Sequence, residues 1–215
     1  MKREDLKAIA PKRFVPRTTD SNHGLAVSAN LLQNAANTPL NKGEVFVGDI
    51  TYLRLRSGGF CYLACLQDKF TRRIVGWKVS ERMPAQLVID VFLQARRRGL
   101  LGKGAIIHTD QGSQYASVDY RRLLYIGGFR QSMSRRGNCY DNAQAESFFS
   151  RFKAELVENG IFESVEQARS EVFGYIEGYY NRIRLHSGLN YQSPLEFEKQ
   201  LKLKNKIRSS ESFVS

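Results

Sequence analysis

The sequence predicts an α/β fold, a five-stranded mixed sheet with helices on its faces. Three segments rich in β-branched and aromatic residues follow one another between Val45 and Lys78, joined by short turns. Two shorter apolar segments come later, and a segment of helical periodicity precedes each of them. Two long helical segments close the order βββαβαβαα, which is typical of a sheet that helices cover.

The first three strands form an antiparallel meander. They are predicted over Val45–Leu55, Phe60–Gln67 and Arg73–Val79. The first turn contains Ser57-Gly58-Gly59, which is a hairpin signal, and a second turn covers Asp68–Thr71.

The later elements are predicted from periodicity and from the residues that break it. Pro84 suits the first turn of a helix, and Gly127-Gly128 ends another. Short apolar runs are typical of buried parallel strands. The predicted helices and strands are Ala85–Arg97, strand Ala105–His108, Ser117–Tyr125, strand Phe129–Met133, Asp141–Glu158 and Val165–Arg184.

The ends of the chain differ in composition from its centre. Residues 1–43 are polar and basic, and we interpret them as an N-terminal arm or linker with little core of its own. We expect one folded domain with its own hydrophobic core over residues 44–198. Residues 199–215 are charged and then Ser-rich, which predicts a frayed or disordered tail.

The net charge of the chain limits the class of binding partner. The formal net charge is +12 and the isoelectric point is near 9.8. This indicates nucleic acid, with a generally basic, solubilising surface as the alternative and an anionic membrane as a weaker one. No apolar run is long enough to span a bilayer, and no secretory signal follows the basic N-terminus. The three cysteines predict no disulfide framework, as expected in the cytoplasm.

Three carboxylates stand on three different elements. Asp49 lies within the first strand, Asp110 follows the fourth, and Glu146 lies in a helix. Three such acids can hold a pair of divalent metal ions, the chemistry of in-line phosphoryl transfer on nucleic acid. Hard carboxylate oxygens favour Mg²⁺, with Mn²⁺ as a substitute.

Each acid alone has a plainer interpretation. Asp49 can be a salt-bridged core residue, and Asp110 a turn or helix-capping residue. Glu146 shares one helix face with Asn142, Ser150 and Lys153, and that face can simply be solvated. The combination of three acids in a basic chain favours the metal site.

Basic and polar residues near these elements are candidate DNA contacts, with a solvated basic face as the alternative. Lys153 lies two helical turns after Glu146, and a basic loop precedes that helix. His108 is interpreted as a packed or hydrogen-bonded histidine rather than a ligand. The candidate DNA-binding residues are Lys153, Arg135, Arg136, Asn142, Arg182, Arg184 and His186.

Four segments carry a family resemblance: GDITYL, IIHTDQGSQYAS, SMSRRGNCYDNAQAESFFSRFKAEL and YYNRIRLHSGLNYQSPLEF. Over roughly residues 12–198 the chain resembles the catalytic core of DDE transposases, the retroviral-integrase-like group. Within that group it is similar to the second-frame product of bacterial insertion sequences of the IS-three family.

The resemblance implies an RNase H-like fold with strand order 3-2-1-4-5. It implies DNA cleavage and strand transfer with two metal ions held by Asp49, Asp110 and Glu146, and a Lys153 that contacts the transposon end. Asn181, Arg182, Arg184 and His186 match a terminal signature of the family. It also implies a homo-oligomer that holds two DNA ends, in a bacterial cytoplasm.

One feature departs from the family. Its helix-turn-helix module for reading transposon ends is not found in residues 1–43. We therefore expect a second-frame product, a remnant or a shortened chain that depends on a first-frame helix-turn-helix protein or a fusion. The alternatives are a catalytically silent DNA-binding remnant or regulator of transposition, and a nuclease that acts on RNA–DNA hybrids.

Overall fold

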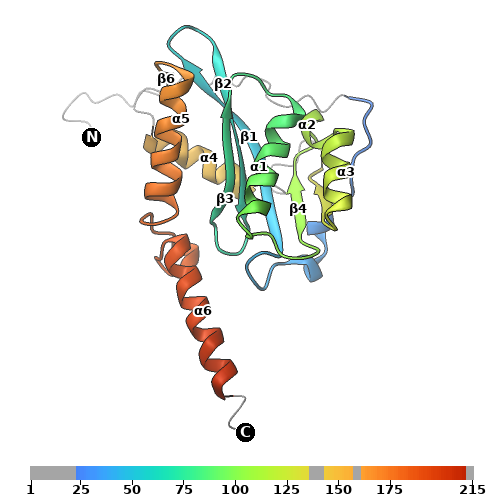
Figure 1. Ribbon diagram of the computed structural model, residues 1–215, viewed down its shortest axis with the longest axis vertical. Coiled ribbons are helices and arrows are strands. Elements are labelled where there is room, and N and C mark those ends of the chain that lie inside the picture. The colour runs from blue at the N-terminus through green and yellow to red at the C-terminus, as the bar shows by residue number, and fades with distance from the viewer. Residues whose placement is uncertain (1–22, 136–142, 157–160, 212–215) are drawn as a thin grey trace, which may run out of the picture.

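The computed structural model describes residues 23–135, 143–156 and 161–211. A twisted mixed sheet forms the centre, with helices on both faces (Figure 1). Its strand order is β3-β2-β1-β4-β5, which confirms the predicted order, and a further short strand, β6, pairs with β1. No helix in the described ranges is long and apolar enough to cross a membrane.

The antiparallel meander is confirmed almost to the residue. β1 (Val45–Leu55), β2 (Phe60–Asp68) and β3 (Ile74–Ser80) pair in sequence. The hairpin pattern in the sequence sets this register, because the turn at Gly58 adopts a positive φ of 92° that glycine tolerates. This places Asp49 opposite Cys65 at the centre of the sheet.

The parallel half of the sheet follows the prediction with one addition. β4 (Ile106–Thr109) pairs with β1, and β5 (Arg130–Met133) pairs with β4. The unpredicted β6 (Ile161–Phe162) pairs in parallel with Arg54 and Leu55, the last two residues of β1. Two residues are too few to show an alternating pattern, so the sequence does not reveal this strand.

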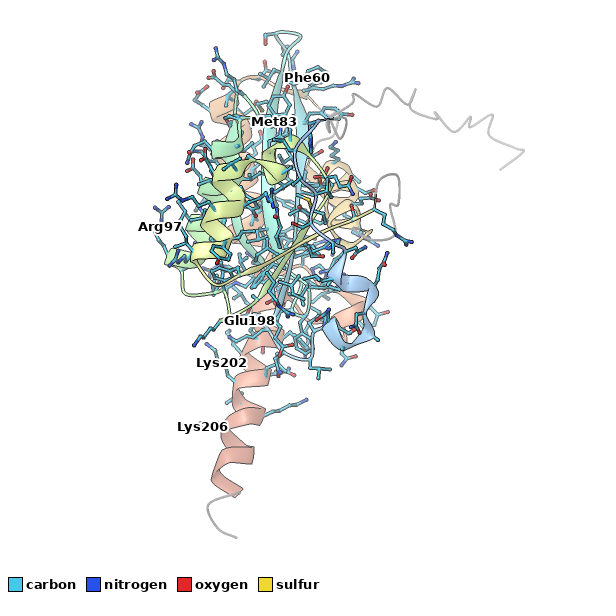
Figure 2. The ribbon with its side chains drawn as sticks, turned by 90° about the vertical axis from the view of Figure 1, so that its right-hand side faces the viewer. Phe60, Met83, Arg97, Glu198, Lys202 and Lys206 are labelled. Atoms are coloured by element: carbon cyan, nitrogen blue, oxygen red, sulfur yellow. The ribbon has the colours of Figure 1, made fainter. Side chains whose placement is uncertain are left out.

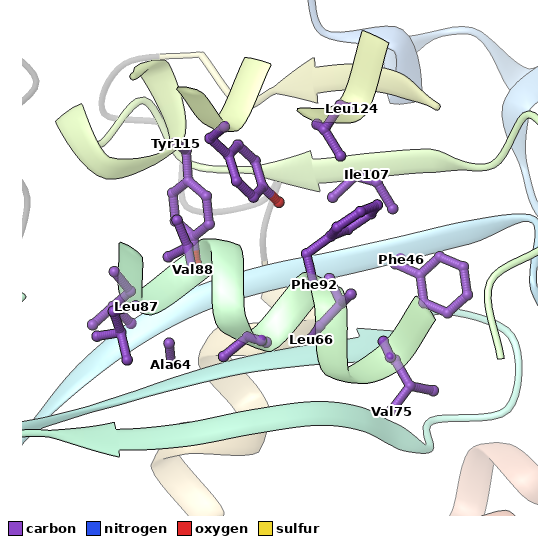
Figure 3. Packing of buried hydrophobic residues seen from close by; sticks show 14 of the residues in the cluster. Phe46, Ala64, Leu66, Val75, Leu87, Val88, Phe92, Ile107, Tyr115 and Leu124 are labelled. Atoms are coloured by element: carbon purple, nitrogen blue, oxygen red, sulfur yellow. The ribbon is translucent and has the colours of Figure 1, made fainter. Parts of the chain in front are cut away.

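One face of the sheet is covered by α1 (Ala85–Arg97) and α3 (Val118–Ile126), with the one-turn α2 (Ser113–Ala116) beside them. Figure 3 shows the interior of this layer, where Phe92 of α1 lies between strand and helix side chains. α1 was predicted with its observed bounds, and α2 was missed because four residues show no periodicity.

The opposite face is covered by α4 (Ala143–Leu156) and α5 (Val165–Phe173). α4 lies within the predicted Asp141–Glu158, whose ends fall outside the described residues. The apolar face of this helix is buried: Ala145, Phe148, Phe149 and Phe152 are each less than 7% exposed. The phenylalanines therefore fix α4 against the sheet.

The last predicted helix, Val165–Arg184, is wrong as a single regular α-helix. α5 ends at Phe173, and a π-helical segment, η4 (Gly174–Tyr180), continues it. The wider turn is closed by the Asn181 N–H, which donates to the Ile176 carbonyl five residues back. It brings the Asn181 side chain to the edge of β3, as described below.

The C-terminal tail was expected to be frayed from residue 199, and this is wrong as far as Glu211. α6 (Pro194–Glu211) is one helix that projects away from the sheet (Figures 1 and 2), with Lys202 and Lys206 on its projecting part. Its Lys, Glu, Gln and Leu residues are good helix formers, so a charged composition did not exclude a helix here.

Within residues 23–43, the part around Ala29 and Leu31 contacts the outer edge of β5. Two short 3₁₀ turns, η1 (Leu31–Gln33) and η2 (Ala35–Asn37), contain no buried residue. The Leu31 N–H donates to the Ser132 hydroxyl at 2.9 Å, and the Met133 N–H donates to the Ala29 carbonyl at 3.4 Å. This segment covers a sheet edge and adds little to either core.

Candidate active site

Asp49 and Asp110 lie side by side because β1 and β4 are parallel neighbours. The last paired residues are Val47 and His108, and the next two residues of each strand bring the two aspartates to the same level. The approach is close at Gly48, where an added Cβ would lie 3.3 Å from Thr109 Cγ2. Asp110 follows the carboxyl end of β4, where α/β sheets form ligand sites.

Local hydrogen bonds orient both aspartates. Asp49 Oδ1 accepts from the N–H of Ile50 at 2.8 Å, and Asp110 Oδ1 accepts from the N–H of Gly112 at 3.0 Å. Each carboxylate keeps a second oxygen that these two bonds do not use. Both aspartates are half-buried.

Glu146 comes from the other layer. It lies in the first turn of α4 and is exposed, on the side of the helix away from the buried Phe148 and Phe152. Burial of part of the carboxyl raises the pKa of Glu146.

The three acids act electrostatically on one another at Asp49. Burial raises the pKa of Asp49 well above its usual range, and the charges of Asp110 and, more weakly, Glu146 raise it further. The Ile50 N–H and the charge of Lys153 oppose that rise. The charges of Asp110 and Glu146 therefore reach Asp49, and the pairing of β1 with β4 sets Asp49 beside Asp110.

The acids do not form a ready metal cage. Within the described ranges, no three His, Cys, Asp or Glu side chains stand close enough together to hold one ion. The donor set nevertheless suits a hard cation: carboxylate oxygens, with mutual repulsion at a buried aspartate that a dication relieves. Asp49, Asp110 and Glu146 supply carboxylate oxygens, the type of ligand that such an ion prefers.

Lys153 belongs to the same site. Its Nζ lies 4.2 Å from the centre of the Tyr52 ring, and the charge of Asp49 raises its pKa while burial, the larger effect, lowers it. Tyr52 in turn packs edge-on against Phe60 at 5.4 Å. Tyr52 lies three residues after Asp49 on the central strand β1, and no pattern in the sequence singled it out.

His108 is a packed residue, as the sequence predicted. Its side chain is fully buried on β4, and Nδ1 lies 2.8 Å from the Ser132 hydroxyl of β5. It bridges two strands of the sheet and does not take part in the exposed surface of the site.

Two residues of the terminal signature have structural contacts. Asn181 is buried and bonds both backbone groups of Ile74, accepting from its N–H at 3.0 Å and donating to its carbonyl at 3.1 Å. Arg184, 9% exposed, pairs with both carboxylate oxygens of Glu155 on α4. These contacts tie the end of η4 to β3 and α4, so the predicted DNA contact at Arg184 has a competing partner within the chain.

The remaining predicted DNA contacts are distributed differently. Arg182 is exposed and its Nε donates to the Glu177 carbonyl at 2.9 Å. Arg135 is exposed at the end of the described range 23–135, while Arg136 and Asn142 lie outside the described residues. His186 is half-buried against Tyr180, with ring centres 4.9 Å apart. Burial, then Arg184 and Arg72, lower its pKa to about 4.

Comparison with known proteins identifies a family. Residues 40–139 match a family described as "Integrase core domain", and residues 146–201 match a second family of the same description. The junction between the two matches falls just before Glu146, so together they cover the segments that carry all three acids.

Curated relatives are bacterial transposases. The transposase for insertion sequence element IS904 of Lactococcus lactis is 50% identical over 156 residues, 73% of this chain and 61% of that protein. Transposase InsF for insertion sequence IS3A of Escherichia coli is 44% identical over 200 residues, 92% of this chain and 68% of that protein. The chain therefore spans about two thirds of the length of these relatives.

Solved structures show the same fold at low identity. A chain of the simian T-cell lymphotropic virus intasome in complex with PP2A regulatory subunit B56 gamma aligns with a TM-score of 0.62 at 15% identity, covering 84% of this chain and 61% of that one. The HTLV-2 integrase catalytic core domain in complex with magnesium aligns at 0.57 and 15%, covering 74% and 97%. The fold is thus the RNase H-like fold of integrase cores, and the chain belongs to the integrase-core transposases of the IS3 family of insertion sequences.

Proposed function

We propose that this chain is the catalytic core that cuts and joins DNA strands in transposition, using divalent metal ions held by Asp49, Asp110 and Glu146. The observation that carries the proposal is the parallel pairing of β1 with β4, which sets Asp49 beside Asp110, with α4, the helix that carries Glu146, packed on β1. Three carboxylates from a central strand, a strand end and a facing helix suit metal-assisted phosphoryl transfer.

The proposed role of each residue follows from the element on which it lies. Asp49 on β1 and Asp110 at the end of β4 would hold the metal ions from the sheet, and Glu146 would hold them from α4. Two Mg²⁺ ions, for which Mn²⁺ substitutes, supply activation of the attacking oxygen and stabilisation of the leaving oxygen when bound. Lys153, held over Tyr52, is placed to contact a phosphate next to them.

The partners follow from the same reaction. DNA is the substrate, both as transposon end and as target, and the net charge of +12 suits its phosphates. Joining two ends requires at least two copies of the core, so we propose a homo-oligomer in the active complex. Reading of the ends is assigned to a helix-turn-helix protein from the first frame or to a fusion with it, and the setting is the bacterial cytoplasm.

A nicking and strand-transfer assay on an end-labelled duplex tests the function. We expect products with Mg²⁺ or Mn²⁺, none with EDTA, and none from Asp110→Asn even when that variant binds DNA as the wild type does. Tight DNA binding without any product from the wild type would instead identify a silent DNA-binding remnant. Faster cleavage of an RNA–DNA hybrid than of duplex DNA would identify a hybrid nuclease.

A further inference from the structure

A hollow opens on the flank of α4, apart from the three carboxylates. Its volume is about 410 Å³, and it lies between α4, the end of β2 and the turn that follows η4. Its α4 wall contains Gln144, Ser147 and Arg151, while none of the three acids lines it. No pattern in the sequence predicted this hollow.

The helix geometry separates the two places. Successive residues of an α-helix turn by about 100°, so Gln144, Ser147 and Arg151 share one face. Glu146 and Lys153 share another, at least about 100° away. The buried phenylalanines occupy the remaining face, so α4 presents one polar face to the carboxylates and a second polar face to the hollow.

The hollow carries an excess of positive charge. Arg72, Arg151 and Arg184 line it, and only Arg184 is neutralised, by Glu155. Among the described residues, neither Arg72 nor Arg151 makes an ion pair within 4 Å. Two unpaired guanidinium groups at one concave site favour an anion.

Arg72 is held in place by its own turn. It adopts a left-handed φ of 63°, its N–H donates to the Asp68 carbonyl at 2.9 Å, and its carbonyl accepts from Gln67 Nε2 at 2.9 Å. Beside it, a Cβ added to Gly188 would meet only Arg72 Nη2, at 3.9 Å. The glycine therefore leaves open space in front of the guanidinium.

One buried polar atom in the hollow lacks a partner. The Nε2 atom of His186 is inaccessible to solvent and forms no hydrogen bond with any described residue. Buried polar groups usually have partners, so this nitrogen is a hydrogen-bonding group beside the hollow that no described residue uses.

We propose that this hollow binds a backbone phosphate of the DNA strand, outside the phosphodiester that the carboxylates cut. The proposal rests on the proposed function for its choice of DNA as the ligand. Arg72 and Arg151 contact the phosphate oxygens, and the open volume accommodates the adjoining sugar. A strand that crosses α4 then meets both polar faces of one helix, which fixes the strand's register relative to Glu146.

The test measures binding of the full chain to a fluorescently labelled duplex of about 30 base pairs over a range of salt concentrations. We expect Arg151→Gln and Arg72→Gln each to weaken binding roughly tenfold and to reduce the salt slope by about one. Arg122→Gln, an exposed arginine of α3 on the opposite layer, removes the same charge and is the matched control. It should change the affinity by no more than about twofold, as a distant surface charge does.

A neutral-phosphate scan locates the contact. Methylphosphonates are introduced one at a time into the duplex; a position that weakens the wild type but not Arg151→Gln marks the phosphate in the hollow. Equal losses in wild type and Arg151→Gln at every position, or affinities of Arg151→Gln that match Arg122→Gln, would overturn the proposal. Should Arg72→Gln fail to fold at its left-handed position, the exposed Arg151 decides the result.

Each of the two proposals can be refuted without refuting the other. Metal-dependent cleavage by the wild type together with an Arg151→Gln variant that behaves as the control removes the phosphate site and keeps the function. A chain without cleavage whose Arg151→Gln variant loses one phosphate contact keeps the phosphate site and removes the function.

Discussion

The two faces of the sheet are built in different ways. The α1 and α3 face is an apolar layer, in which Phe92, Tyr120 and Leu124 are at most 2% exposed. The α4 and α5 face has a similar apolar centre around Phe152, but polar bonds surround it. Glu155, for example, accepts hydrogen bonds from Arg184 and Tyr175.

This difference shows that one face of the sheet only supports the fold, whereas the other supports the fold and also carries residues of the candidate site. The first face contains none of the acids and acts as support for β1 and β4. The second face holds α4, which carries Glu146, Lys153 and Arg151, by phenylalanines below and by polar bonds at its sides. A loss of packing on this face is therefore expected to disturb the site as well as the stability.

The largest expected effect is on stability, and it is equal on the two faces. Phe92→Ala and Phe152→Ala each remove a buried ring, and each should lower the free energy of unfolding by about 3–5 kcal/mol. Urea titration followed by circular dichroism measures both. A loss at Phe152 well below that at Phe92 would show that α4 is loosely packed, against the structure.

Milder variants separate stability from activity. Phe92→Leu and Phe152→Leu keep most of the apolar volume and should each cost about 1–2 kcal/mol. We expect Phe152→Leu to reduce strand cleavage more than Phe92→Leu at equal folded fraction, because Phe152 lies one residue from Lys153 and under the helix that carries Glu146. Equal activities would show that both faces only support the fold.

The next effect concerns the polar anchor of η4. Asn181→Ala leaves the N–H and the carbonyl of Ile74 without their side-chain partner at a buried site, and should destabilise the chain by about 2–3 kcal/mol. Asn181→Asp retains the acceptor for the Ile74 N–H and loses the donor. An unfolding free energy for Asn181→Ala within about 0.5 kcal/mol of the wild type would contradict the anchoring role.

The Glu155–Arg184 pair gives a smaller, pH-dependent effect. The hydrogen bond from Arg184 lowers the pKa of Glu155 below its usual range, so the pair's stabilisation is present above the unfolded-state pKa of about 4.3 and lost as pH falls through the lower folded value. Glu155→Gln should cost about 1–2 kcal/mol at pH 7, below the ~3–5 kcal/mol of a fully buried pair, because the pair is partly exposed. Thermal unfolding of both proteins from pH 7 to 3 should show the difference shrinking; a constant difference would show that the pair is not ionic.

The smallest effect is at His186. Burial, with the charges of Arg184 and Arg72, lowers its pKa to about 4, against the partial opposition of Glu155. The unfolded chain then binds a proton that the folded chain does not, so this residue lowers stability as pH falls from about 6.5 to about 4. Histidine NMR spectra should show His186 neutral at pH 6, and Arg72→Gln should raise its pKa. A wild-type midpoint above 6 would mean that the ring is solvated.

The sequence was sufficient for the elements that repeat a pattern over several residues. The eleven residues of β1 and the helix Ala85–Arg97 have the bounds that alternation and helical spacing predict. The two aspartates could be found because Asp49 interrupts, and Asp110 ends, an otherwise apolar strand segment. β6 and α2 were missed because a few residues show no period, and α6 because its helix-forming residues were interpreted by charge alone.

The hollow beside the second polar face of α4 could not be predicted from the sequence. Gln144, Ser147 and Arg151 do lie at helical spacing, so the sequence contains that signal. Arg72, however, is 79 positions away from Arg151 and meets the same hollow only because the β2–β3 turn folds back to α4. Contacts of this kind depend on tertiary structure.

The most direct test of the central claim compares two glutamates on the α4 and α5 face of the sheet. Glu146→Gln removes the proposed metal ligand of α4, whereas Glu171→Gln removes the same charge from α5, outside both the acids and the hollow. Strand cleavage with Mg²⁺ is measured for both, with folding checked by thermal unfolding. The account predicts no cleavage by Glu146→Gln and wild-type cleavage by Glu171→Gln; metal-dependent cleavage by folded Glu146→Gln at the wild-type rate would contradict it.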